Sequence, residues 1–148
     1  MAGKKVGKFV TVSIDDSGGT ARVVSTDVTG VGGLNLAYAK IDAGGYTEDL
    51  NFLTGRGDSE ITIDGIINDT ASTGLHTVCS GIVGGNTART VTIAIGDNAT
   101  VTTGDPEFEG EFLCHTYTVT PDLNGAVTVQ AIFAPAVGQS LPAWGTVA

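Results

Sequence analysis

Apolar and polar residues alternate with a period of two along most of the chain. The clearest case is RTVTIAI at 89–95, where Val91, Ile93 and Ile95 share one face, opposite threonine and alanine. Such alternation with β-branched residues is typical of half-buried strands, and the Gly, Asp and Asn clusters between the runs are typical of turns. The pattern predicts strands at 9–14, 21–29, 33–41, 60–67, 89–95, 107–120 (with a bulge near Gly110) and 126–134.

One segment, 68–85, has a helical pattern instead. Its apolar residues fall on one helical face, at i, i+3, i+4 and i+7: Leu75, Val78, Cys79 and Ile82. Asp69 is a suitable N-cap and Gly84 a suitable C-terminal stop, so we expect a short helix over about 69–83. Two internal glycines each cost about 1 kcal/mol relative to alanine. The helix therefore needs a sheet to pack against.

These elements fit a single mainly β domain over 1–148, a β-sandwich or barrel of about seven or eight strands with one packed helix. A chain of 148 residues has the size of one domain. Three segments lie outside the alternating pattern: a basic N-terminal arm at 1–8, a long Gly-rich interaction loop at about 42–58, and an extended C-terminal tail at 135–148. We expect Trp144, the only tryptophan, to dock onto a neighbour.

The composition points to a surface that is poor in charge. Charged residues make up 16% of the chain, below the roughly 25% of typical soluble domains, and the mean hydropathy is +0.21. Such a chain usually covers its apolar surface with a partner, often a copy of itself. The net charge of −9 should repel nucleic acid. No apolar run approaches about 18 residues and no secretory signal is evident, so we expect no membrane span and no secretion.

Candidate metal ligands are few. His76, Cys79, Cys114 and His115 could bind zinc, but their spacing matches no common zinc pattern. Adjacent residues of a strand also point to opposite faces, which separates Cys114 from His115. We expect a buried core thiol at Cys79 and no disulfide between the two cysteines.

Catalytic patterns are also lacking. Neither histidine has a marked acid partner, and no serine lies in a G-x-S-x-G elbow. The acidic pairs Glu48/Asp49 and Glu107/Glu109 lack the aromatic surroundings of a glycoside cleft, since aromatics make up 6% of the chain. We therefore expect no enzyme and no cofactor.

The tripeptide Arg56-Gly57-Asp58 spells a sequence that animal adhesion receptors bind. Its place at the end of the long loop favours a simpler interpretation, in which Gly57 gives a turn its conformational freedom before the next strand. An adhesion module stays a minor alternative.

The order of the elements carries a family resemblance. GKFVTVSIDDSGG (7–19) has the form of an opening strand, and AKIDAGGYTEDLNFLTGRGDSEITIDGIIN (39–68) that of a long excursion and returning strand. GLHTVCSGIVGG (74–85) follows as the helix, and EFEGEFLCHTYTVTPDLNGAVTVQAIFAP (107–135) as two closing strands. In this order, over roughly 8–135, the chain resembles the tail tube proteins (major tail proteins) of long-tailed bacteriophages.

The resemblance implies a structural virion protein assembled in the bacterial cytoplasm. Six copies would form a ring, and stacked rings would form the tail tube through which double-stranded DNA passes without specific binding. It also implies contacts with a tape measure protein and a tail terminator. The alternatives are another phage structural β-protein, such as a capsid decoration protein or a terminator, and the adhesion module.

Two sets of residues are expected to serve this assembly. The contact loop between subunits would contain Asp42, Tyr46, Glu48, Asp49, Phe52, Leu53 and Arg56. The acids expected to face the lumen are Asp27, Asp42, Glu48 and Asp49. We further expect the loop at 42–58 and the arm at 1–8 to become ordered only on assembly.

Overall fold

The computed structural model describes residues 5, 9–45, 52–97 and 100–148. This part of the chain contains ten strands and one helix, which confirms a mainly β fold with a single short helix. In chain order they are β1 (Val10–Asp15), β2 (Ala21–Val23), β3 (Val28–Gly32), β4 (Ala37–Asp42), β5 (Phe52–Asp58), β6 (Ile61–Ile66), α1 (Leu75–Ile82), β7 (Arg89–Ile95), β8 (Pro106–Thr120), β9 (Thr128–Pro135) and β10 (Ala143–Thr146).

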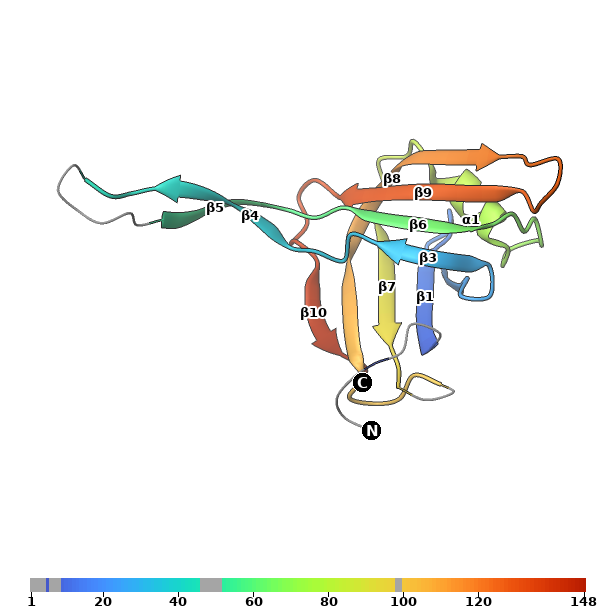
Figure 1. Ribbon diagram of the computed structural model, residues 1–148, viewed down its shortest axis with the longest axis horizontal. Helices are drawn as coiled ribbons and strands as arrows, with labels where there is room; N and C mark the ends of the chain where they lie inside the picture. Colours follow the sequence, from blue (N-terminus) through green and yellow to red (C-terminus); the bar gives the residue numbers. More distant parts are fainter. Residues whose placement is uncertain (1–4, 6–8, 46–51, 98–99) are drawn as a thin grey trace.

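Eight strands form one antiparallel sheet that curls around the core. The order is β2-β1-β7-β8-β9-β6-β3, and β10 also pairs with β8. The 15-residue strand β8 joins the two halves, because 107–112 pair with β7 and 112–120 pair with β9. In Figure 1 β1 and β7 run crosswise to β9, β6 and β3, so the two halves face each other as in a sandwich.

The core lies between these two halves and is filled by the alternating apolar residues. Its largest fully buried side chains include three phenylalanines, Phe108, Phe112 and Phe133. Val91 and Ile93 of β7 are also fully buried, as the period-two pattern predicted. Local alternation thus decides which face of each strand is buried.

Several predicted boundaries are wrong. The segment at 21–29 contains two strands, β2 and β3, that pair with different partners. The bulge of β8 lies between Cys114 and Thr116, where His115 is the extra residue, and not near Gly110. The loop expected at 42–58 is in part a hairpin, since β4 pairs with β5. The C-terminal tail contains β10, which pairs with the start of β8.

The helix begins six residues later than predicted, and Asp69 does not cap it. Gly74 is its N-cap, without a side-chain cap. A carboxylate distant in sequence takes that role, because the Leu75 N–H donates to Asp27 Oδ2 at 3.2 Å. The C-terminal end is as expected: Gly84, with φ +77°, follows the last turn. No helix in the described part of the chain is long and apolar enough to span a membrane.

Candidate subunit interface

The hairpin formed by β4 and β5 projects away from the body of the sheet (Figure 1). Ile41 lies directly opposite Leu53, and the Cδ1 atom of Ile41 would lie 3.0 Å from a Cβ placed at Gly55. A Cβ placed at Gly57 would lie 2.6 Å from the Cε1 atom of Tyr38, so the Tyr38 ring covers this glycine. The register of the pair shifts between Tyr38 and Lys40, so Gly55 and Gly57 do not share one face of the ribbon. Ile41 and Leu53 therefore form an apolar face beside Gly55, whereas Tyr38 lies on the opposite face, over Gly57.

This apolar face is not covered by the described part of the chain. The exposed fractions are 50% for Ile41 and 60% for Leu53, and Tyr38 on the other face is 48% exposed. The opposite face of the ribbon contains Lys40, opposite Thr54, together with Tyr38. An isolated two-stranded hairpin is marginally stable in water. An amphipathic hairpin with one bare apolar face is therefore suited to bind another surface.

The base of the hairpin is held by the C-terminal segment. A Cβ at Gly57 would lie 2.3 Å from Leu141 Cδ1, and one at Gly110 would lie 2.5 Å from Pro142 Cβ. Glycine is needed at both positions because another segment passes directly over the backbone. The C-terminal segment thus connects the hairpin to β8.

Arg56-Gly57-Asp58 lies in β5, paired with β4, and not in the turn that the sequence suggested. Gly57 serves close packing here, not a turn conformation. The residues predicted to contact a neighbour are divided by the structure. Asp42, Phe52, Leu53 and Arg56 lie on the hairpin strands, whereas Tyr46, Glu48 and Asp49 are outside the described residues.

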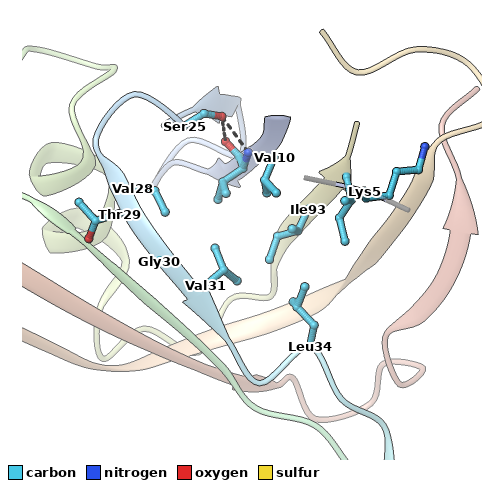
Figure 2. A pocket seen from close by; sticks show the side chains of 11 residues that line it. Lys5, Val10, Ser25, Val28, Thr29, Gly30, Val31, Leu34 and Ile93 are labelled. Atoms are coloured by element: carbon cyan, nitrogen blue, oxygen red, sulfur yellow. Dashed lines mark hydrogen bonds between the residues drawn. The ribbon is translucent and has the colours of Figure 1, made fainter. Parts of the chain in front are cut away.

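A second uncovered apolar surface is a groove between β1 and β3, which we call the seam groove. These two strands are not hydrogen-bonded neighbours in the sheet. Between them lies a cavity of about 650 Å³ that opens to solvent. Figure 2 shows valines of β1 and β3 facing each other across it. The half-buried apolar side chains in its lining are Val10, Val28, Val31, Leu34 and Ile95.

Lys5 is placed at the groove by two carboxylates. Its Nζ atom lies 2.7 Å from Asp105 Oδ1 and 3.6 Å from Asp97 Oδ2. The hydrogen bond from Lys5, with that from the Thr102 N–H, lowers the pKa of Asp105. The same bond raises the pKa of Lys5. Lys5 is the described part of the predicted arm at 1–8, and the rest of that arm lies outside the described residues.

The outward faces of the two sheet halves are free of basic side chains in β6, β7, β8 and β9, all of which the structure describes. On the first half, Glu107 and Glu109 face outward, and Glu109 accepts a hydrogen bond from Thr92. On the second half the outward residues are mostly threonines, and Gln130 donates to Asp64 at 2.9 Å. In these four strands, neither face offers an ammonium or guanidinium group to a phosphate backbone.

Asp27 is placed differently from the other acids predicted for the lumen. Its half-buried carboxylate accepts hydrogen bonds from Asn68 Nδ2 at 3.0 and 3.1 Å, besides that from Leu75. This carboxylate has a role in holding α1. Asp42 is exposed on the hairpin and accepts the Gly44 N–H at 2.9 Å.

The Cys and His side chains do not gather into a metal site. No group of three or more metal-ligating side chains occurs in the described ranges. Both cysteines are free and buried; burial raises the pKa of Cys79 to about 12 and of Cys114 to about 11. His76 Nδ1 is hydrogen-bonded to the Tyr117 hydroxyl at 2.8 Å, and His115 Nε2 lies 3.7 Å from Glu60.

Trp144 packs within its own chain. Its ring lies 5.0 Å from that of Phe108, its partner across the β10–β8 pair, and 47% of the residue stays exposed. A docking role of Trp144 toward a neighbour remains a proposal, for which the exposed part of the ring is available.

The fold is shared with chains of phage-like tails, although no family model and no curated protein matches the sequence. A chain of the extended PVC sheath–tube complex of an extracellular contractile injection system has a TM-score of 0.73 at 14% identity, over 99% of this chain and 95% of that chain. A chain of the anti-feeding prophage tube-terminating cap has a TM-score of 0.74 at 12% identity, over 99% and 94%. The SPP1 tail tube has a TM-score of 0.70 at 9% identity, over 97% and 80%. The tail tube fold expected from the sequence is thereby confirmed.

Proposed function

We propose that this protein is a structural subunit of a phage-type tail tube that assembles into stacked rings. Each ring would contain six copies, the number that the resemblance implies. The observation that carries the proposal is the projecting hairpin with exposed large apolar side chains, Ile41 and Leu53 on one face and Tyr38 on the other. In a chain with the tube fold, such a ribbon is an arm for a neighbouring copy. Its role is structural and not enzymatic.

The proposed tube is a conduit for double-stranded DNA. The chain carries a net charge of −9, and the outward faces of β6, β7, β8 and β9, strands that are fully described, lack Lys and Arg. Charges on the tube wall interact with DNA phosphates over a screening length of about 8 Å at physiological salt. A neutral or acidic wall lets phosphates pass without binding them. Asp42, Glu48 and Asp49 remain the proposed lumen acids, whereas Asp27 is engaged within the chain.

Virion location and partners follow from this proposal. The subunit would be assembled in the host cytoplasm, become part of the tail, and contact a tape measure protein and a terminator. The loop between β4 and β5 and the arm at 1–8 would make contacts between copies.

A tube terminator is the second candidate, because one of the solved structures with this fold comes from a tube-terminating cap. A terminator forms one ring and stops, whereas a tube subunit continues to stack. A capsid decoration protein would form discrete small oligomers.

Negative-stain microscopy of the purified protein at high concentration tests these candidates. We expect long, hollow, regularly striated tubes. Single rings at every concentration would favour the terminator, and trimers that never polymerise would favour decoration. A protein that stays monomeric at every concentration would contradict the proposal.

A further inference from the structure

We infer that the C-terminal segment sets the angle at which the hairpin of β4 and β5 leaves the body. We call residues 136–142 of this segment the strap. The strap holds the hairpin through Leu141 and is itself held on the body by β8. When the strap is lifted, the hairpin turns about its base. The strap acts within a single chain, so its role does not depend on the proposed function.

The base of the hairpin is a break in the strand pairing. β4 and β5 form a two-stranded sheet of their own, which projects from the large sheet that contains β3 and β6 (Figure 1). The pairing of the large sheet stops at Gly32 and that of the hairpin begins at Ala37. Gly33 starts the connection between them with φ +75°, a conformation that favours glycine. Because the ladder is interrupted there, strand pairing does not fix the angle of the hairpin.

The returning connection contains a buried polar group without a partner. Ser59 is 2% exposed, and within the described residues its Oγ atom has no hydrogen bond. A buried hydroxyl without a hydrogen bond destabilises the arrangement that buries it. Other contacts must therefore hold the hairpin in its observed position.

Leu141 of the strap and Tyr38 of β4 provide such a contact. A Cβ placed at Gly57 would collide with the Cδ1 atom of Leu141 and would lie 2.6 Å from the Cε1 atom of Tyr38. The two side chains thus meet over the backbone of Gly57, close to the end of β5. Leu141 is half-buried, although the strap residues at 137–140 are exposed. This contact lies at the base of the hairpin, where a small displacement turns the whole ribbon.

The strap is held on β8 at both of its ends. At its start, the Ala136 N–H donates to the Glu111 carbonyl at 3.0 Å. At its end, Pro142 is buried and packs directly over Gly110. β10 follows immediately and pairs with the first residues of β8. The position of Leu141, and with it the angle of the hairpin, is therefore coupled to the contacts of the strap with β8.

A hairpin held at one angle presents Ile41 and Leu53 in one direction. A partner surface then meets an element that is already oriented, so less conformational entropy is lost on binding. With the strap lifted, the same side chains would lie on a hairpin that samples many angles. The strap is thus a conformational device that orients the hairpin before it binds.

Distances between two spin labels, measured by double electron–electron resonance, test the strap. One label is placed on the hairpin at Thr54→Cys and the other on the body at Thr118→Cys, both at exposed positions. Cys79 and Cys114 are buried and free, and the wild-type protein under the same labelling conditions controls for them. With the strap in place we expect one narrow distribution of distances.

The measurement is confined to single chains. The protein is kept at a dilution at which microscopy shows no tubes, and labelled chains are mixed with an excess of unlabelled ones. Each measured distance then lies within one chain, and no neighbouring copy fixes the hairpin. Circular dichroism of each variant shows that the sheet is retained.

Leu141→Ala should broaden the distribution about twofold, because the hairpin loses its contact with the strap. Tyr38→Ala removes the other half of this contact, so it should have the same effect, and the double variant should add little to either single variant. Gly110→Ala should also broaden the distribution, because its Cβ displaces Pro142 and lifts the strap. The matched control Val137→Ala shortens a 91% exposed side chain of the same strap and should change nothing.

Three results would overturn the strap. They are a distribution that is already broad in the wild type, an unchanged distribution in Leu141→Ala, and equal broadening by the Val137→Ala control. An unchanged distribution in Gly110→Ala would overturn the coupling of the hairpin to β8.

Microscopy of the concentrated protein tests the tube function separately. Tubes, together with an unchanged distribution in Leu141→Ala, would overturn the strap and leave the tube function intact. Broadening in Leu141→Ala of a chain that never assembles would support the strap and contradict the tube function.

Discussion

The carboxylate of Asp27 accepts the backbone N–H of Leu75 across 48 positions of sequence. Leu75 is the first residue of α1, and the N-cap Gly74 has no side chain to satisfy this donor. The segment before β3 therefore fixes where the helix begins. Asn68 donates to the same carboxylate, so one acidic side chain fixes both the helix and the loop that leads to it.

Removal of this carboxylate should destabilise the protein. Asp27→Ala is expected to lower the free energy of unfolding by about 1–2 kcal/mol, because the helix start and Asn68 lose their acceptor. Urea unfolding followed by circular dichroism measures this. Asp69→Ala is the control and should change the value by less than about 0.5 kcal/mol. A larger effect at Asp69 than at Asp27 would show that the helix is capped locally.

Close packing over Gly110 should make that position intolerant of a side chain. A Cβ there would lie 2.8 Å from Pro142 Cα, which is backbone and cannot swing aside. Gly110→Ala should therefore lift the C-terminal segment and shift the fluorescence of Trp144, the only tryptophan, to longer wavelength. Gly32→Ala is the control, since a Cβ at Gly32 meets nothing within 4 Å. Identical emission spectra for both variants would contradict the packing.

The ion pair of Lys5 with Asp105 should make stability depend on acid pH. The pKa of Asp105 is lowered in the folded protein, so the pair contributes stability above the unfolded value near 3.8, and this is lost as pH falls through the folded pKa. Asp105→Asn should lower the melting temperature at pH 7, and the difference from wild type should shrink at pH 3. Asp122→Asn, in an exposed turn, is the control and should show no such pH-dependent difference.

The two thiols should be unreactive in the folded protein. Burial raises the pKa of Cys79 to about 12 and of Cys114 to about 11, above the ordinary value of 9.0, so the reactive thiolate is scarce at pH 8. Ellman's reagent should label both cysteines of the protein unfolded in urea. Within the same time it should label neither cysteine of the folded protein in buffer. Because the neutral form is favoured by folding, the thiols' contribution to stability is full below pH 9 and declines above it. Rapid labelling in buffer would contradict the burial.

The adhesion tripeptide should be inactive. Arg56-Gly57-Asp58 is part of a paired strand, and Tyr38 and Leu141 cover Gly57. Integrin-bearing cells should attach equally to surfaces coated with the wild type and with Asp58→Glu. Attachment that is lost in the variant would revive the adhesion alternative.

Local alternation was sufficient to predict much of the sheet. In β7 and β9 each residue's face follows from its position along the strand, so the buried Val91, Ile93 and Phe133 could be identified without a structure. The helix face from Leu75 to Ile82 could be identified in the same way. The tail tube fold was expected from the order of the elements and not from any one motif.

The interface could not be predicted in the same detail. Gly55 and Gly57 interrupt the alternation of the hairpin, so its sequence favours a loop, yet these glycines are where Ile41 and Tyr38 lie. The sequence of β10, AWGT, has no alternation of polar and apolar residues. This strand forms because it pairs with β8. The seam groove depends on two strands that are close in space without being paired.

The amino-acid sequence by itself determined the strands, the buried face of each and the acidic surface, because these depend on residues a few positions apart. Tertiary structure alone decided the capping of α1 by Asp27, the apolar face of the hairpin and the open seam between β1 and β3. These features depend on which distant segments meet, and that is set by packing of the whole sheet and not by any local pattern.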